Sequence, residues 1–180
     1  MKAFGKNADV KHFEQVFLPH LNAAHNLARW LLRDGVAAQD VVQESCLRAF
    51  ASQHQFIGGN ARAWLLKIVR NQCYTWLQES SGKCMIDIDN EATMSELDKA
   101  TLSHSDLPEK LVTKIQDAQR LQQALDELPP VFKEAIVLKE LEEFSYKEIA
   151  SVTGVPIGTV MSRLARGREM LKKELLSNDE

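Results

Sequence analysis

Two arginines, a serine and a threonine near the end of the chain have the chemistry and the spacing needed to read duplex DNA. Thr159, Ser162, Arg163 and Arg166 follow one another at steps of three and four residues, so a helix would carry them on one face. Arginine can donate paired hydrogen bonds to guanine or to phosphate, and hydroxyl side chains bond to bases or to the backbone. This face is therefore predicted to fit a major groove.

The residues around this face fit a helix-turn-helix, with helices over 145–153 and 156–175. Gly154 suits the left-handed backbone of the tight turn between them, because it carries no Cβ. Ala150 is small enough for the second helix to cross closely, and Val160 is placed to seal the angle between the helices. The same spacing also occurs in ordinary helix pairs, whose arginine-rich faces are merely solvated.

Ser145 and Glu148 have the spacing of a capping box at the start of the first of these helices. Gly158 lies in the first turn of the second helix, where free N–H groups face outward, and would allow DNA to approach closely. Gly167 lies further along that helix, at a cost of about 1 kcal/mol relative to alanine. Either the helix packs closely at Gly167 or the site tolerates glycine.

Three helices are predicted in the first 78 residues, because apolar side chains recur there at helical spacing. The first apolar face runs from Phe13 to Leu32 and ends near Gly35. The second and third helices are expected over 37–52 and 60–78. The loop between them closes on Gly58-Gly59, a strong signal for a turn.

Four further helices are predicted in the last third of the chain. They are expected over 117–128, 130–142, 145–153 and 156–175. Pro129-Pro130 separates the first two, because proline is tolerated best in the first turn of a helix. No stretch alternates in a way that indicates a sheet, so the sequence predicts an all-α protein of two small helical domains.

A linker with little periodicity joins the two domains, with one short helix expected over 92–102. Residues 79–119 carry nine Asp/Glu against four Lys/Arg, whereas residues 1–78 carry five against nine. The remaining acids crowd into 126–148, and basic residues cluster from Arg163 onward. The formal net charge of -3 therefore hides a basic face that is compatible with nucleic acid.

The composition, with 44% hydrophobic and 26% charged residues among 180, is that of an ordinary globular protein. No apolar run is long enough to cross a bilayer, and the first ten residues lack a signal-peptide core, which predicts a cytoplasmic protein without membrane insertion. Cys46, Cys73 and Cys84 lack metal-ligand spacing, so no metal site or cofactor is expected. The scattered histidines and the lack of a phosphate-binding loop also predict no catalytic site.

Several motifs together resemble those of an extracytoplasmic-function (ECF) sigma factor of RNA polymerase, in the sigma-70 family. The motifs are Asp40-Val-Val-Gln43-Glu44-Ser-Cys-Leu47-Arg48-Ala-Phe50, Ala63-Trp64-Leu65-Leu66-Lys67-Ile68-Val69-Arg70-Asn71, Leu128-Pro129-Pro130 and Gly158-Thr-Val-Met-Ser-Arg-Leu-Ala-Arg-Gly-Arg168. The resemblance implies a region 2 domain over 10–78, a flexible acidic linker over 79–117 and a region 4 domain over 118–176. The linker resembles a segment that approaches the RNA path in relatives, where acids would mimic RNA, although an inert tether explains it equally well.

By this resemblance, one face of the helix over 37–52 binds the clamp helices of the polymerase's largest subunit. The residues implied are Asp40, Gln43, Glu44, Leu47 and Arg48. They share one helical face, and its acids would complement a basic partner. Many relatives carry an acid just before this aspartate, whereas this chain has Gln39, which would weaken the contact slightly.

The resemblance also implies two promoter-reading surfaces. The region 2 surface would hold an unpaired base of the -10 element and its phosphates, and the residues implied are Phe56, Ile57, Asn60, Arg62, Trp64, Lys67, Arg70 and Asn71. The region 4 surface would read the -35 element, and the residues implied are Ser145, Gly158, Thr159, Ser162, Arg163, Arg166 and Arg168. Trp64 is as well explained by the core as by base stacking, and Trp76 is better explained by the core.

The implied partners are bacterial core RNA polymerase, promoter DNA and a cognate anti-sigma factor that releases the protein in a stress or envelope response. The main alternative is a stand-alone helix-turn-helix regulator that binds operator DNA without polymerase. That alternative leaves the Asp40/Gln43/Glu44 face and the glycine loop without a role. A redox role for the cysteines is also conceivable, but Cys46 and Cys73 fall in apolar helical patterns and are expected to pack as small hydrophobic residues.

Overall fold

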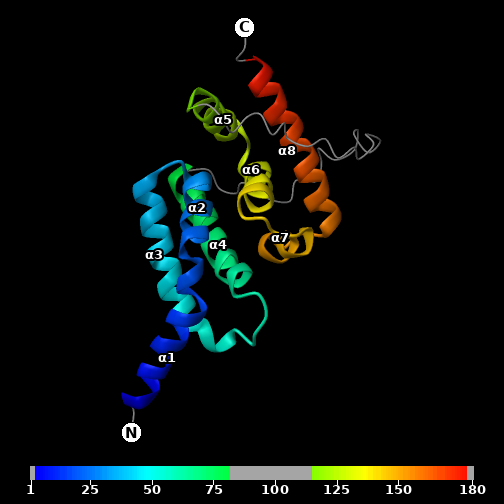
Figure 1. The fold of residues 1–180 in the computed structure, drawn as a ribbon. Helices are drawn as coiled ribbons and strands as arrows, with labels where there is room; N and C mark the ends of the chain where they lie inside the picture. The colour runs from blue at the N-terminus through cyan, green and yellow to red at the C-terminus, as the bar shows by residue number, and fades with distance from the viewer. Residues whose placement is uncertain (1–2, 82–114, 178–180) are drawn as a thin grey trace.

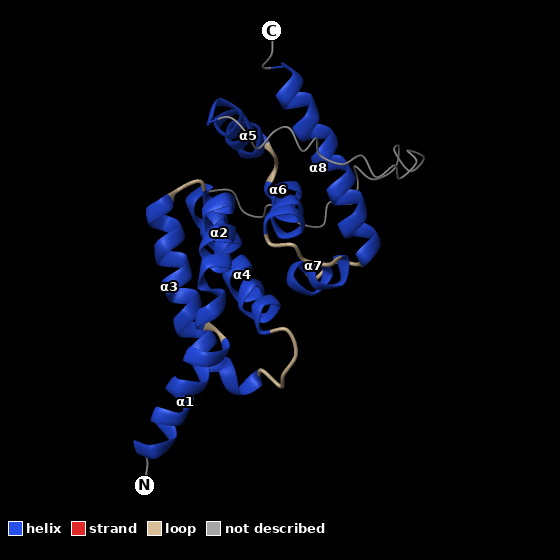
Figure 2. Cartoon of the chain, in the orientation of Figure 1, coloured by secondary structure: helices blue, strands red, loops and turns tan. Residues whose placement is uncertain are grey.

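The structure is a computed structural model that describes residues 3–81 and 115–177, and every regular element in these two ranges is helical (Figure 2). The helices of the N-terminal half are α1 (Ala3–Val16), α2 (Leu21–Leu32), α3 (Gly35–Ser52) and α4 (Ala61–Ser81), with short 3-10 turns at Leu18–His20 and Gln53–Gln55. Those of the C-terminal half are α5 (Ile115–Glu127), α6 (Pro130–Ile136), α7 (Tyr146–Thr153) and α8 (Ile157–Ser177), with a π-helical turn at Val137–Leu141 after α6. The all-α prediction is confirmed. The short helix expected over 92–102 lies outside the described residues.

The first predicted helix is divided, which the apolar periodicity did not reveal. Pro19 lies in the 3-10 turn between α1 and α2, and the helical hydrogen-bond pattern cannot pass through it because proline has no N–H. Phe17 at the break is fully buried. The apolar face continues across the break, so the periodicity alone gave one helix where the structure has two.

The junction between α2 and α3 also lies about two residues earlier than predicted. Arg33 takes the left-handed conformation that ends α2 (φ 58°), rather than Gly35. The Asp34 carboxylate accepts hydrogen bonds from the N–H groups of Val36 and Ala37 at 2.8 and 3.1 Å. Asp34 is therefore the N-cap of α3.

The predicted helix-turn-helix is confirmed in α7 and α8. Ser145 and Glu148 form the capping box, and Gly154 ends α7 with φ 75° and an N–H bond to the Ala150 carbonyl at 2.9 Å. Val160 is buried in the angle between the two helices. The local signals in the sequence therefore fix this motif.

Gly167 is required by packing, which resolves the alternative left open by the sequence. A Cβ at this position would lie 2.9 Å from Cδ1 of Ile136 and 3.3 Å from Cβ of Phe132. The absence of a side chain therefore lets α8 lie against α6 (Figure 1).

The two halves pack against each other through a shared core. Figure 1 shows α4 of the N-terminal half beside α6 and α7 of the C-terminal half, and the main contacts join α4 to α7 and α2 to α6. Buried apolar residues of both halves belong to one continuous cluster. The sequence predicts two domains but contains no signal for this packing.

Candidate nucleic-acid interface

The outward side of α3 carries the five residues expected to bind polymerase. Asp40, Gln43, Glu44, Leu47 and Arg48 are all exposed, and we call this surface the open face. Leu47 lies in the middle of this face and is 66% exposed. Arg48 pairs with Glu44 at 2.8 Å, an exposed i,i+4 pair that contributes little to stability.

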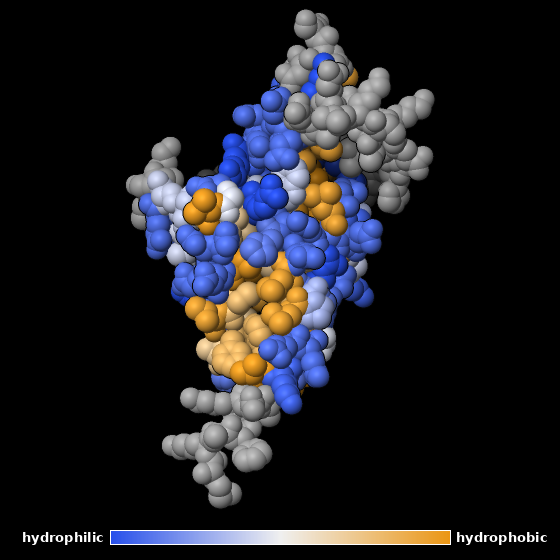
Figure 3. Space-filling view, turned by 60° about the vertical axis from the view of Figure 1, so that its left-hand side comes forward, coloured by the Kyte–Doolittle hydropathy of each residue, from blue (hydrophilic) through white to orange (hydrophobic). Residues whose placement is uncertain are grey.

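Apolar side chains gather where α3 ends beside α1. Figure 3 brings this side of the molecule forward and shows an apolar area bordered by polar residues. Phe50 is 37% exposed, and its ring meets that of Phe13 edge-on at 5.5 Å. An exposed apolar area next to paired charges is typical of a surface that receives a protein partner.

The loop before α4 builds an aromatic wall beneath an exposed tip. The rings of Phe56, Trp64 and Phe17 lie 5.0 to 5.6 Å apart, and Phe17 is fully buried. Ile57 at the tip is 97% exposed. Gly58 and Gly59 have φ of 92° and 104°, conformations that turn the chain sharply after Ile57.

Trp64 and Phe56 are half-buried, so each contributes to the core while keeping part of its surface open. Trp76 is likewise half-buried and packs against the core. Core packing and base stacking were both expected of Trp64, and its half-buried position is compatible with each. Lys67 and Asn71, two other expected DNA contacts, are exposed on α4.

Asn60 begins α4 and also contacts the C-terminal half. Its Oδ1 atom accepts a hydrogen bond from the Ala63 N–H at 3.0 Å, so Asn60 caps the helix. Its Nδ2 atom donates to Oε1 of Glu148 at 2.5 Å. Hydrogen bonds from Ser145, together with this one from Asn60, hold the pKa of Glu148 below its usual value.

Arg62 is bound to the C-terminal half in the same way. Its guanidinium donates to the Glu142 carboxylate and, at 2.9 Å, to the Glu142 carbonyl oxygen. The guanidinium also lies over the Phe144 ring, 4.8 Å from the centroid. Glu142 accepts a further hydrogen bond from Asn26 at 3.2 Å.

Arg70 makes the most buried of these contacts. Its Nε atom donates to Oε1 of Glu134 at 2.5 Å, and the Tyr74 hydroxyl donates to Oε2 at 3.2 Å. Arg70 is 6% exposed and Glu134 is 0% exposed. Burial raises the pKa of Glu134, and the charge of Arg70 opposes that rise.

These contacts cover part of the surface expected to bind the -10 element. We call Asn60, Arg62, Arg70 and Tyr74 the covered face, in which Arg70 and Tyr74 are buried, Arg62 is half-buried and Asn60 is bonded but still exposed. Each of them hydrogen-bonds to a carboxylate from 134–148 in the C-terminal half. The sequence analysis did not identify these acids as partners, and its only signal for them was the crowding of acids in 126–148.

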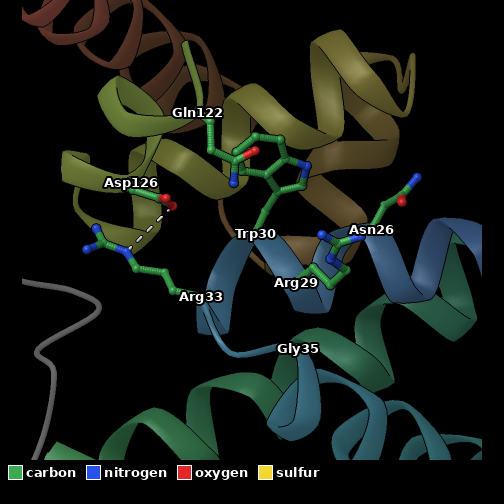
Figure 4. Close-up of a pocket in the computed structure, with 7 residues that line it drawn as sticks. All are labelled: Asn26, Arg29, Trp30, Arg33, Gly35, Gln122 and Asp126. Carbon is green, nitrogen blue, oxygen red and sulfur yellow. Dashed lines mark ion pairs between the residues drawn. The ribbon is translucent and has the colours of Figure 1, made fainter. Parts of the chain in front are cut away.

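The interface ends in a polar cleft of about 290 Å³ between α2 and α5. Figure 4 shows Trp30 of α2 extending toward Gln122, and the ion pair between Arg33 and Asp126 across the opening. That pair is long, at 3.8 Å, and its members are partly exposed. At this end the two halves meet through polar groups rather than through a sealed apolar contact.

The residues expected to read duplex DNA are partly exposed along α8. Thr159, Ser162, Arg163 and Arg166 are half-buried, and Gly158 is exposed with open space where a Cβ would point. The charge of Arg163 acts on buried Glu134, so Arg163 also borders the contact between the halves.

The two remaining members of this set have partners within the C-terminal half. Arg168 pairs with Glu140 at 2.6 Å. The Ser145 hydroxyl donates to Glu148 at 2.7 Å and accepts from its N–H in the capping box.

Within residues 3–81 and 115–177, no helix is long and apolar enough to cross a membrane. The same residues contain no group of His, Cys, Asp or Glu that could hold a metal ion. Burial raises the pKa of Cys73 to about 12 and also raises that of Cys46, so both thiols stay protonated at neutral pH.

Two family models match the chain. The model for sigma-70 region 2 matches residues 16–82, and the model for sigma-70 region 4 matches residues 118–171. The first covers the open and covered faces, and the second covers the helix-turn-helix.

Curated relatives match along nearly the whole chain. The ECF RNA polymerase sigma-E factor of Haemophilus influenzae is 33% identical, over 94% of this chain and 90% of the relative. The ECF RNA polymerase sigma factor SigW of Bacillus subtilis is 27% identical, over 94% and 92%. For the sigma factor SigE of Mycolicibacterium smegmatis, 32% identical, the match spans 96% of this chain and 65% of the relative.

A solved structure has the same architecture. The sigma factor RpoE of Bartonella quintana, crystallised in complex with the anti-sigma factor NepR, matches with a TM-score of 0.69 and 30% identity over 94% of this chain and 99% of that one. The sequence motifs, the helix-turn-helix and these matches agree, and the chain belongs to the ECF sigma factors of RNA polymerase, the subunits that direct core polymerase to promoters.

Proposed function

We propose that this sigma factor divides its work between three surfaces. The open face of α3 binds core polymerase, the loop before α4 together with α4 holds the unpaired -10 element, and α8 reads the -35 element as duplex. The corresponding domains are region 2 over 10–78 and region 4 over 118–176, joined by the linker over 79–117.

The open face is the observation that supports this proposal most strongly. Leu47 and Phe50 remain exposed beside the charges of Asp40 and Glu44, although neighbouring apolar residues of α3 are buried. An apolar centre with an acidic border suits a basic, partly apolar partner surface such as a pair of polymerase clamp helices. A regulator that acts without polymerase has no use for such a face.

The -10 surface needs a pocket for an unpaired base and cations for its phosphates. The exposed tip at Ile57 and the ring edges of Phe56 and Trp64 offer apolar and aromatic walls. Arg62 and Lys67 offer positive charge nearby. Asn60 has an amide that can hydrogen-bond to a base edge.

Gly158 supports the assignment of the -35 surface to α8, in addition to the arginines. Glycine near the start of α8 weakens the helix, and no contact within the described chain requires it, since a Cβ there would meet open space. A phosphate approaching the N-terminal turn of α8 gives the missing side chain a purpose. Arg163 and Arg166 then lie on the side of α8 that enters the groove.

The partners follow from the family and from the Bartonella quintana complex. We infer that a cognate anti-sigma factor holds this protein until a stress or envelope signal releases it. Because the proposed partners, core polymerase and promoter DNA, are in the bacterial cytoplasm, we infer that the protein acts there. The chain acts as a subunit and needs no catalytic site or cofactor of its own.

The test is transcription in a reconstituted reaction. Purified protein is added to bacterial core polymerase on a genomic promoter library, and transcript starts are mapped by sequencing. We expect discrete starts that require the protein and share a -10 and a -35 sequence. Sequence-specific duplex binding without core, combined with no initiation, would instead identify a stand-alone regulator.

A further inference from the structure

We propose that region 4 of this chain blocks its own -10 surface, so that the free protein is closed and its two domains must part before region 2 can bind DNA. This inference rests on the proposed function of the covered face. The blocking surface consists of Glu134, Glu142 and Glu148, which we call the acidic latch.

Each acid of the latch pairs with one of three predicted -10 contacts. Glu134 binds Arg70, Glu142 binds Arg62, and Glu148 binds Asn60. Carboxylate oxygens offer arginine the same paired, charge-assisted hydrogen bonds that phosphate oxygens offer. In the closed chain the latch therefore uses the donors that the promoter backbone would need.

Burial makes the two uses exclusive. Arg70, Glu134 and Tyr74 lie inside the contact between the domains, where a DNA strand cannot reach them. Phe144 lies beneath the Arg62 guanidinium and is also buried. A strand that pairs its phosphates with Arg62 and Arg70 has to displace region 4.

The contact is specific without being strongly stabilising. Removing charges such as Arg70 and Glu134 from water offsets much of their mutual attraction. The Nη2 atom of Arg70 is buried without a hydrogen-bond partner, which adds to the cost of closure. The polar cleft at Arg33 and Asp126 leaves one edge of the interface accessible to water. A partner that binds the open chain better can therefore shift the equilibrium.

Core polymerase is suited to be that partner. The open face lies on a different side of region 2 and remains exposed in the closed chain. Core can therefore dock on α3 first and separate the domains afterward. The free protein would then bind promoter DNA weakly until it joins core.

The first experiment compares the wild type with Glu134→Gln/Glu142→Gln. These substitutions keep the side-chain shapes and remove two of the three charges of the latch. Small-angle scattering measures the overall dimensions, and fluorescence anisotropy measures binding of a labelled oligothymidylate in the absence of core. We expect a larger radius of gyration and about tenfold tighter binding, because apparent affinity rises with the fraction of open molecules.

The matched control is Glu140→Gln/Glu143→Gln. It removes the same net charge from the same segment, but Glu140 pairs with Arg168 inside region 4 and Glu143 is exposed. We expect wild-type dimensions and only a small change in binding. Equal gains in the two double variants would show a general charge effect and would overturn the proposal.

A second variant keeps the test valid if loss of the Glu134 charge disturbs folding. Glu142→Gln/Glu148→Gln leaves the buried pair intact, and glutamine preserves the capping box at Ser145. Circular dichroism checks that the helices are retained. We expect an intermediate gain in binding, and wild-type dimensions and affinity in both latch variants would overturn the proposal.

Transcription assays separate this inference from the proposed function. In one outcome, the wild type initiates at promoters with core, but the free latch variants have wild-type dimensions and wild-type affinity for oligothymidylate. That outcome would overturn the proposed closure and leave the sigma function supported. In the opposite outcome, the latch variants expand and bind oligothymidylate more tightly, but neither they nor the wild type initiate transcription with core. That outcome would overturn the proposed function and leave the closure supported.

Discussion

The two proposed binding faces of region 2 are presented very differently in the free chain. The face on α3 is open to solvent at all five of its positions, which share one helical side. The face on α4 is bonded to region 4 through Asn60, Arg62 and Arg70. With the proposed roles of the two faces, this difference predicts that the protein binds core polymerase first and DNA second.

The physical reason lies in the residues of each face. Leu47 and Phe50 can stay exposed at little cost until an apolar partner arrives. The arginines of α4 can be enclosed only with opposite charges, and region 4 supplies them. The apolar residues of α3 therefore tolerate exposure to solvent in the free chain, whereas the arginines of α4 are enclosed together with acidic partners.

The largest effect is expected from charge reversal on the open face. Glu44→Arg places a cation against a basic partner and removes the pair with Arg48, so affinity for core polymerase should fall by about 100-fold, or roughly 3 kcal/mol. Fluorescence titration with labelled core measures it. Glu79→Arg, the same reversal at an exposed position near the end of α4, is the control. Normal core affinity in the Glu44 variant would remove the polymerase-binding role of the open face.

Gly167→Val tests the close packing of α8 against α6, the helix whose Glu134 contacts α4. The valine side chain would collide with Ile136 and Phe132, so the free energy of unfolding should fall by about 1 to 3 kcal/mol. Thermal unfolding followed by circular dichroism measures this loss. A variant as stable as the wild type would show that α8 does not depend on close packing against α6.

Arg163→Ala tests the border between the covered face and the -35 surface. If Arg163 contacts a base, recognition of the -35 element should weaken by roughly 1 to 3 kcal/mol. Promoter competition in the reconstituted reaction reads this out as a loss of -35 preference while the -10 preference persists. An unchanged -35 preference would assign Arg163 to the domain contact alone.

Gly158→Ala is expected to separate DNA binding from folding. Alanine favours the helix and has space, so the free energy of unfolding should stay the same or rise by up to about 1 kcal/mol. Binding to -35 duplex should weaken, because the methyl group keeps the DNA backbone away. Gel-shift titration and thermal unfolding of the same sample compare the two effects. Unchanged duplex affinity would show that the glycine serves no close approach.

The smallest effect concerns two thiols that report on the two faces. Cys46 is half-buried on α3, whereas Cys73 is buried on α4 with a pKa of about 12. Because the thiolate is the reactive form, iodoacetamide at neutral pH should modify Cys46 before Cys73, and Cys73 should react faster as the pH rises toward that value. Peptide mapping by mass spectrometry follows each cysteine separately. Faster reaction of Cys73 than of Cys46 at neutral pH would contradict the burial of α4.

Local signals made much of the fold predictable. The capping box at Ser145, the turn at Gly154 and the seal at Val160 depend on neighbours in the sequence, and the structure confirms each of them. The helix containing Phe17 was predicted without a break because an apolar face can continue through a proline turn. The reason for Gly167 became visible only with α6 beside it.

The candidate site was less predictable, because its partners are distant in the sequence. The helical spacing places Asp40 and Glu44 on one exposed face, as expected. Arg70 looked like a surface phosphate contact, since no local pattern shows that Glu134, 64 positions later, will enclose it. Pairing across a domain contact depends on packing that helical periodicity does not encode.

Hydroxyl-radical footprinting of the full chain, alone and bound to core polymerase without DNA, tests the difference between the two faces most directly. In the free chain, Leu47 and Phe50 should be modified while buried Tyr74 and Phe144 are protected. Core binding should reverse the pattern, protecting the open face and exposing the two buried rings. Modification of Tyr74 and Phe144 in the free chain, at the level found with core, would contradict a closed free protein.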